Sequence, residues 1–133
     1  ELFNYLVAKN IQPIGYSPIG SPSRPTRDKT PEDAVDMEDP VVIKISERLN
    51  VHPAVVCIKW AIQRGGIAIP FSVKPKQIKS NLLAVVEKRI TDEEMEEMKK
   101  AEKGSRLIKG HVFLWEGASG WEDLWDIDGT ITK

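Results

Sequence analysis

The chain has 133 residues and a formal net charge of −1, enough for one domain and with no general attraction to nucleic acid or an anionic membrane. Apolar residues make up 41% and charged residues 29%, as in globular proteins, and no apolar run approaches the roughly 20 residues that span a bilayer. The one cysteine, Cys57, excludes an intrachain disulfide and fits a reducing compartment, so we expect a cytoplasmic protein.

The first element is the end of an amphipathic helix, predicted over residues 2–9 with Asn10 as its left-handed terminator. Its apolar spacing is already under way at Leu2 and no cap precedes it, so we expect a piece of a longer chain. A strand is predicted from Ile11 to Tyr16, although Pro13 cannot donate a hydrogen bond to a neighbouring strand.

A long polar loop is predicted over residues 17–37. Four prolines exclude a regular element from most of it: Pro18, Pro22, Pro25 and Pro31. The loop is also locally basic, through Arg24, Arg27 and Lys29. This composition suits an anionic ligand, or equally a loop that is only solvated.

Two helices are predicted next. Asp39 and Pro40 form a strong helix start, and the apolar spacing of the residues after them places Val42, Ile45 and Leu49 on one face. The second helix runs from Pro53 to about Arg64 and is apolar in its centre except for Lys59, which predicts a mostly buried helix. Its cysteine and Trp60 are interpreted as core, and His52 as a cap or an exposed residue.

The rest of the chain alternates in the same way. We predict a strand at 67–70 that is buried on both faces, and a helix from Pro75 with Ile78 and Leu82 facing inward. Thr91 begins a capping box, whose helix is predicted to reach Lys103 with an inner stripe of Met95, Met98 and Ala101. Residues 105–133 form an irregular tail that holds Trp115, Trp121 and Trp125.

No motif for a metal, a Gly-rich dinucleotide loop, a Walker A loop or a serine nucleophile is present. The α/β alternation predicts a parallel sheet, in which ligands bind beyond the carboxyl ends of the strands. There Tyr16 offers a ring face, Ser17 and Ser21 offer hydroxyls, and the loop at Ser72 and Val73 lies at a helix N-terminus. We interpret this edge as suited to a dinucleotide.

Two stretches resemble the aldo-keto reductases. Residues 16–21 (Y-S-P-I-G-S) are similar to the Y-S-P-L-G-S loop of that family, and residues 69–81 (I-P-F-S-V-x-P-x-Q-I-x-x-N) are similar to its I-P-K-S-x-x-P-x-R-I-x-x-N cofactor motif. The start of the helix at Thr91 and the helices between the motifs also resemble the family. The resemblance implies the C-terminal part of a TIM (β/α)8 barrel over residues 1–104, incomplete in this chain, and a substrate-pocket tail over 105–133.

The resemblance also implies roles for single residues in binding NADPH or NADH. Tyr16 would stack on the nicotinamide, and Ser17, Ile19 and Ser21 would lie along the pyrophosphate. Ser72 and Val73 would hold the adenosine phosphate, with Gln77 and Asn81 near the adenine. Trp115 and Trp121, which match no fixed motif, would line the pocket of a small carbonyl substrate.

The sequence departs from the family at two positions. Phe71 stands where members commonly have Lys, and Gln77 where they commonly have Arg; those cations hold the 2′-phosphate of NADPH. The departures predict relaxed or NADH-leaning cofactor choice, unless Lys74, Lys76 or Lys79 substitutes.

The family's catalytic Asp, Tyr, Lys and His come from the first half of the barrel. The resemblance therefore implies a part of an oxidoreductase that reduces aldehydes or ketones, with no catalytic residue in this chain. We expect the 133 residues to be inactive alone, to need the N-terminal part of the barrel, and to associate through exposed apolar edges.

Two alternatives stay open. One is a non-catalytic nucleotide-binding or interaction module derived from the same barrel. The other is a helix-turn-helix, which the pattern of residues 45–60 mimics and whose second helix would offer a DNA groove chiefly Lys59, Gln63 and Arg64. The negative net charge disfavours DNA, and we expect neither a nucleic-acid nor a membrane partner.

Overall fold

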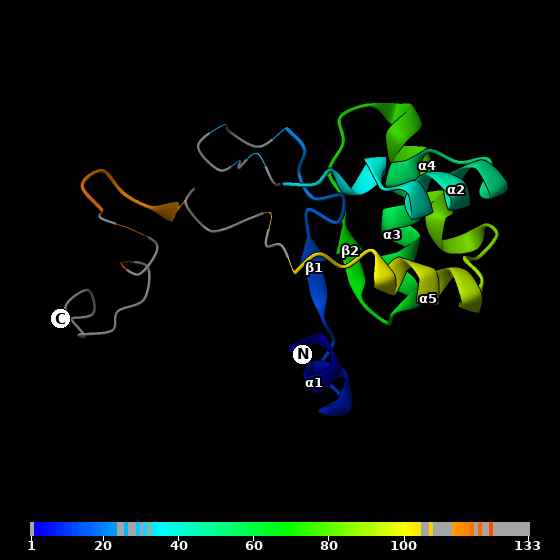
Figure 1. Cartoon of the computed structure of the whole chain (residues 1–133), viewed down its shortest axis with the longest axis horizontal. Coiled ribbons are helices and arrows are strands. Elements are labelled where there is room, and N and C mark those ends of the chain that lie inside the picture. The colour runs from blue at the N-terminus through cyan, green and yellow to red at the C-terminus, as the bar shows by residue number, and fades with distance from the viewer. Residues whose placement is uncertain are drawn as a thin grey trace. The chain divides into compact units, whose positions relative to one another are not determined.

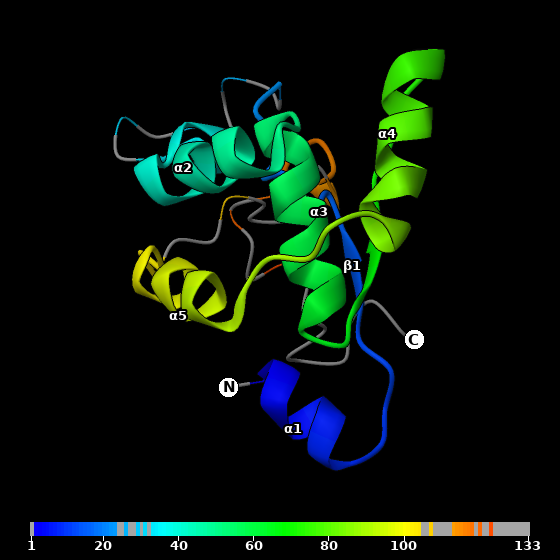
Figure 2. The same cartoon turned by 90° about the vertical axis from the view of Figure 1, so that its right-hand side faces the viewer.

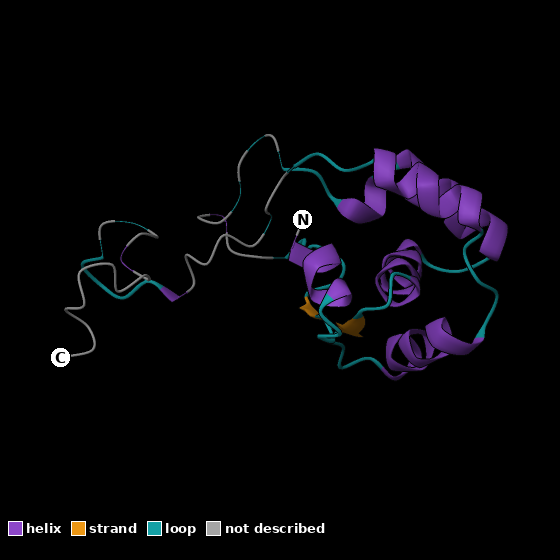
Figure 3. Cartoon of the chain, turned by 90° about the horizontal axis from the view of Figure 1, so that it is seen from below, coloured by secondary structure: helices purple, strands orange, loops and turns teal. Residues whose placement is uncertain are grey.

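The computed structural model describes residues 2–23, 26, 29, 31, 33–104, 107, 113–118, 120 and 123. The chain divides into two compact units, one of residues 1–22 and 34–103 and one of residues 23–33 and 104–133. The first unit contains, in order, α1 (Leu2–Ala8), β1 (Ile14–Tyr16), a 3-10 turn η2 (Asp36–Glu38), α2 (Pro40–Leu49), α3 (Pro53–Gln63), β2 (Ile67–Ile69), α4 (Pro75–Val86) and α5 (Asp92–Lys100) (Figure 1). The first unit is a helix-rich α/β structure, with the sheet small beside the helices (Figure 3).

The sheet consists of β1 and β2, paired in parallel with Ile14 opposite Ile67 and Tyr16 opposite Ile69. The prediction of a parallel pair is confirmed. Strand β1 is shorter than predicted and begins after Pro13, which has no N–H to donate. Its carbonyl still accepts a hydrogen bond of 2.9 Å from the Ile67 amide, so the pairing continues one residue beyond the strand.

The prediction that residues 67–70 are buried on both faces is wrong. The side chains of Ile67 and Ile69 are 50% and 55% exposed, whereas Ala68 is partly buried and packs against the cluster of Val55 and Ile58 on α3. Successive side chains of a strand point to opposite faces. One face is therefore covered by α3, and no described element covers the other.

Helix α3 is mostly buried, as predicted, and is the central helix of the first unit. Figure 2 shows it with α2 and α5 on one side and α4 on the other. Its buried residues contribute to two clusters: Val56 and Cys57 pack with residues of α2 and α5, and Val55 and Ile58 pack with Ala84 of α4. Full burial of each such aliphatic side chain contributes about 1.5–3 kcal/mol.

The predicted helix starts are confirmed. Asp39 accepts a hydrogen bond of 2.9 Å from the Val41 amide, His52 Nδ1 accepts one of 3.2 Å from the Ala54 amide, and Thr91 forms a complete capping box with Glu94. These side chains satisfy amides that have no acceptor within their helix. The helix ends were less accurate, since α5 ends at Lys100 rather than Lys103.

Lys59 is buried, at 2% exposure, although it carries an amine. Its Nζ donates to the carbonyls of Ala84 at 2.8 Å and Glu87 at 3.4 Å. Burial lowers the pKa of Lys59, and the charge of Glu87 partly offsets that effect. Lys59 thus satisfies carbonyls at the end of α4 and ties that helix to α3.

The inner face of α4 was predicted wrongly. Ile78 and Leu82 are 43% and 70% exposed, whereas Ala84 is buried. Helix α4 contacts α3 through this small alanine and through Lys59, which turns its larger apolar side chains away from α3. Among the described residues no element covers them.

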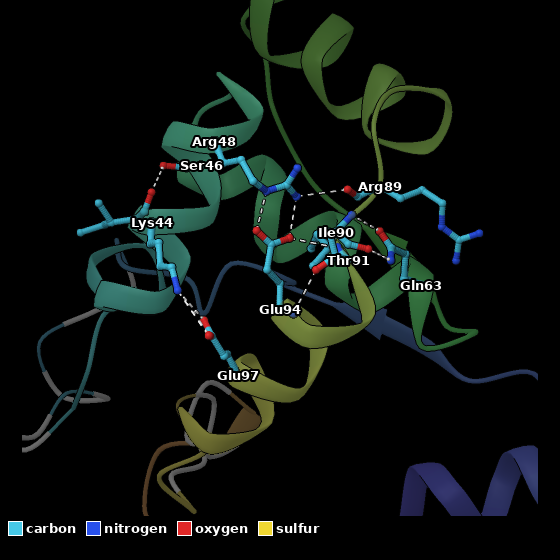
Figure 4. A network of polar contacts seen from close by, with 10 residues as sticks. Lys44, Ser46, Arg48, Gln63, Arg89, Ile90, Thr91, Glu94 and Glu97 are labelled. Atoms are coloured by element: carbon cyan, nitrogen blue, oxygen red, sulfur yellow. Dashed lines mark hydrogen bonds and ion pairs between the residues drawn. The ribbon is translucent and has the colours of Figure 1, made fainter.

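A polar network joins α5 to α2 and α3 (Figure 4). Arg48 donates through Nε and Nη2 to the two carboxylate oxygens of Glu94, which also accepts 2.9 Å from the Thr91 amide. Gln63 donates to the Ile90 carbonyl at 2.9 Å and accepts from its amide at 2.8 Å. The network holds the segment before α5 against both neighbouring helices.

Glu94 is almost fully buried, and its ionised carboxylate matches the hydrogen-bond donors around it. Burial alone would raise its pKa, but hydrogen bonds from Arg48 and Thr91, with the charges of Arg48 and Lys44, hold the pKa of Glu94 below its ordinary value. A lowered folded-state pKa contributes stability that is present above the unfolded pKa of about 4.3 and is lost as pH falls through the folded value.

We therefore predict that Glu94→Gln lowers the free energy of unfolding at pH 7 by about 1–3 kcal/mol, because an amide N–H would face the donors of Arg48 or Thr91. Urea unfolding of both proteins at pH 7 and at a series of acidic pH values measures this. The difference should shrink as the pH falls through the folded-state pKa of Glu94. Glu97→Gln is the matched control, since its partner Lys44 is exposed. An equal loss in both variants would contradict the special role of Glu94.

Candidate functional site

The parallel register brings two loops to the same edge of the sheet. Tyr16 and Ile69 are partners at the ends of their strands, so the loop that begins at Ser17 and the loop that begins at Pro70 leave the sheet side by side (Figure 1). This was the arrangement on which the predicted ligand edge depended. In parallel sheets that edge is where ligands bind.

Tyr16 presents its ring at this edge. The side chain is 65% exposed at the last position of β1. An exposed aromatic face that the strand holds in place can stack on a flat heterocycle.

The loop after Tyr16 is a tight turn. The Gly20 amide donates 3.0 Å to the Ser17 carbonyl, and the backbone is left-handed at Ser17 (φ 47°), Gly20 (φ 72°) and Ser21 (φ 47°). Left-handed serines cost free energy that the surrounding contacts must offset. Here the Ile19 side chain packs against both hydrophobic clusters and anchors the turn. The Ile19 side chain is thus partly buried in packing contacts, which leaves its backbone available to a ligand.

The second loop is built around Ser72. Its Oγ accepts 3.0 Å from the Lys74 amide and donates 2.6 Å to Gln77 Oε1. Phe71 and Val73, on either side, are exposed. Nothing in the spacing of Ser72 and Gln77 in the sequence predicts that their side chains form a hydrogen bond.

Asn81 lies one turn after Gln77 on α4 and is partly buried. Residues four apart share one face of a helix, so the structure places Gln77 and Asn81 on the same face. Of the residues predicted here, the structure joins Ser72 to Gln77 by a hydrogen bond and places Asn81 on the same helix face as Gln77.

The predicted substrate-pocket residues belong to the second unit. Trp115 is 52% exposed and begins a turn closed by a 3.1 Å hydrogen bond from the Ala118 amide to its carbonyl. Trp121 lies outside the described residues, as do Arg24 and Arg27 of the basic loop. Their roles, and the domain boundary between residues 104 and 105, stay predictions.

The contacts of α3 give no support to the helix-turn-helix alternative. Lys59 and Gln63 are bound to backbone groups of the fold, and the Arg64 guanidinium lies 4.2 Å from the ring centre of Trp60 and 4.3 Å from that of Phe3. All three side chains proposed for a DNA groove are therefore engaged inside the protein.

No group of three or more His, Cys, Asp or Glu residues in the described part of the chain is placed to hold a metal ion. No helix there is long and apolar enough to cross a membrane. Cys57 is buried in the core, where burial, with the charges of Asp36 and Asp39, raises the pKa of its thiol to about 12. The interpretation of Cys57 as a core residue is confirmed.

Comparison with known proteins matches residues 1–103 to the model of the aldo/keto reductase family. Aldo-keto reductase family 1 member A1-A of Danio rerio is 37% identical over 123 residues, covering 92% of this chain and 37% of the relative. Aldo-keto reductase family 1 member A1 of Sus scrofa is 36% identical over 108 residues, covering 81% and 32%. Aldo/keto reductase slr0942 of Synechocystis is 32% identical over 127 residues, covering 95% and 38%. The chain thus spans about a third of the length of these relatives.

We predict that Cys57 is inert in the folded protein. A thiol-reactive chromogenic reagent at pH 8 should label the native chain at least about 100-fold more slowly than the chain in denaturant, because only the thiolate reacts and the folded core keeps it protonated and covered. Rapid labelling under native conditions would contradict the burial of this thiol.

Proposed function

Since the chain belongs to the aldo/keto reductase family, we propose that it forms the cofactor-binding side of an NAD(P)H-dependent oxidoreductase that reduces aldehydes or ketones to alcohols. The family consists of oxidoreductases on a TIM barrel, and the parallel pair with its helices is consistent with part of such a barrel. The observation that carries the proposal is the register of Tyr16 with Ile69, which aligns the two predicted cofactor loops.

The side chains at this edge fit a nicotinamide dinucleotide. In the proposal the exposed ring of Tyr16 stacks on the nicotinamide, and the turn of Ser17 and Ser21, with the backbone of Ile19, lies along the pyrophosphate. Ser72 and Val73 hold the adenosine phosphate, with Phe71 beside them, and Gln77 and Asn81 lie near the adenine. When bound, the cofactor supplies a hydride to the carbonyl carbon of the substrate.

The proton for the product alcohol must come from a positioned acid. We propose that this acid lies in the part of the protein outside these 133 residues, as the resemblance implies. The chain's own contribution is to orient the nicotinamide through Tyr16 and, through Trp115 and Trp121, to form a wall of the substrate pocket.

The same proposal accounts for the uncovered apolar surface. Ile14, Ile67 and Ile69 of the sheet are exposed, as is a stripe along α4 that consists of Ile78, Leu82, Val85 and Val86. Parallel strands are normally buried on both faces. Because the relatives are more than twice as long as the matched region, we propose that the remaining strands and helices of the barrel cover these residues.

We predict that Tyr16→Ala weakens binding of reduced nicotinamide cofactor about 3–10-fold, whereas Tyr16→Phe, the matched control, keeps the ring and most of the affinity. Titration of a chain extended to the relatives' length, followed by the fluorescence of the reduced cofactor, measures both. Equal cofactor affinity of the alanine variant and the unmodified chain would contradict the proposed role of Tyr16 in cofactor binding.

We also predict that the 133-residue chain binds cofactor without turnover. Mixing it with NADH or NADPH and a panel of aldehydes and ketones should leave the absorbance of the reduced cofactor unchanged. Turnover would show that a proton donor is present in this chain. Binding without turnover in a chain extended to the relatives' length would instead favour the non-catalytic module.

A further inference from the structure

We propose that α4 opens and closes as a unit while the rest of the first unit stays folded, and that the buried amine of Lys59 is the contact that holds it closed. The part of the chain that moves is residues 70–89, here called the α4 segment. It lies between strand β2 and the buried Ile90. This motion follows from the packing of the chain and does not depend on which ligand the candidate site binds.

Helix α4 is held to the protein by little buried surface. Of its 12 residues only Ala84 is buried, with Asn81 and Leu83 partly buried. By comparison, α2 buries four of its 10 residues and α3 buries five of its 11. An alanine removes less apolar surface from water than a larger aliphatic side chain does, and so contributes less to stability. Hydrophobic packing therefore holds α4 more weakly than it holds α2 or α3.

The α4 segment is fixed at its two ends. Before it, Ile69 is paired with Tyr16 in the sheet. After it, Ile90 is 2% exposed and exchanges two hydrogen bonds with the side chain of Gln63. An opening of α4 can therefore leave both ends in place, because neither the sheet nor the Ile90 contacts involve residues of the helix.

The connections on either side of α4 lie at the surface. Phe71 and Val73 before the helix are exposed, as are residues 87–89 after it. Exposed segments of this kind can change conformation without disturbing a core. The first connection also contains Ser72, whose hydroxyl bonds Gln77 of the helix. Opening of α4 would therefore displace the second loop of the candidate site as well.

Lys59 supplies the polar contact that keeps α4 on α3. Its Nζ donates 2.8 Å to the Ala84 carbonyl and 3.4 Å to the Glu87 carbonyl, at the helix end where carbonyls lack amide partners. Burial of an amine costs free energy, and burial lowers the pKa of Lys59. Opening exchanges these bonds for bonds to water, so their net contribution is modest. The contact is therefore specific in geometry and readily reversible.

The other side of α3 is packed independently of α4. Figure 2 shows α2 and α5 on one side of α3 and α4 on the other. Cys57 belongs to the cluster with residues of α2 and α5, whereas Lys59, two residues further along the same helix, bonds α4. One helix thus carries two reactive groups, an amine covered by α4 and a thiol covered by the rest of the core.

Chemical labelling of the unmodified chain tests the motion. The chain is treated with an acetylating ester or a thiol reagent, and mass spectrometry gives the rate at each site relative to its rate in denaturant. We expect Lys59 to be about 10–1000-fold more protected than the exposed Lys76 of α4, and Cys57 at least about tenfold more protected than Lys59. Urea below the unfolding transition should hardly change the Lys59 rate but should raise the Cys57 rate steeply, because opening α4 exposes little new surface.

Hydrogen exchange of a variant tests the role of the amine. Lys59→Met keeps an unbranched apolar side chain and removes the donors, so the amides of residues 75–86 should exchange about 3–10-fold faster. The amides of residues 92–100 in α5 should keep their rates. Lys79→Met is the matched control, since it removes an exposed amine from α4 itself and should leave the exchange of α4 unchanged.

Two results would overturn the inference. Equal protection and equal urea dependence of Lys59 and Cys57 would mean that the first unit opens only as a whole. Exchange of α4 that is the same in Lys59→Met and in the unmodified chain would mean that packing alone closes the helix. If Lys59→Met does not fold, the labelling of the unmodified chain still decides whether α4 opens separately.

Discussion

The parallel pairing of β1 with β2 is the constraint on which the first unit depends. The chain between the two strands must return to the start of the sheet, and it does so through α2 and α3. Helix α3 then packs on the sheet through Ala68 and separates two hydrophobic clusters. The same pairing aligns Tyr16 with Ile69, so the geometry that forms the core also brings the two loops together. Fold and candidate site therefore share one cause.

The polar residues at the C-terminal end of α3 hold this helix against its neighbours. Lys59 donates to a carbonyl near the end of α4, and Gln63 pairs with both backbone groups of Ile90. Arg64 lies against the rings of Trp60 and Phe3. The contacts with the α4 carbonyls, with Ile90 and with Phe3 each join α3 to a different segment of the chain. Buried polar groups are tolerated when they are paired, and here the pairing also specifies which neighbour lies on which side of the helix. The polar residues of α3 would suit a helix that binds DNA if the sequence were considered alone. In the structure they determine how the helices are arranged.

Local chemistry in the sequence predicted the elements well, because the signals were local. Asp39 before Pro40, His52 before Pro53 and the capping box at Thr91 act within a few residues, and the structure has helices beginning at each. Burial was predicted less well, since Ile67, Ile69 and Leu82 follow apolar patterns whose covering elements are not among the described residues. The contacts of Ser72 with Gln77 and of Arg48 with Glu94 were not predictable, because they depend on side-chain directions that only the folded backbone sets.

The two ends of the candidate site differ in how firmly the fold holds them. The turn after Tyr16 has left-handed serines, and Ile19 fastens it to the clusters on both sides of α3. The position of that turn is therefore coupled to the packing of the core, and a cavity near Ile19 would disturb both. The second loop relies on hydrogen bonds of Ser72 at an exposed surface, with Phe71 and Val73 free of the core. Side chains there can change without loss of packing, so the second loop is the part of the candidate site where binding preference can vary while the position of the turn after Tyr16 stays fixed.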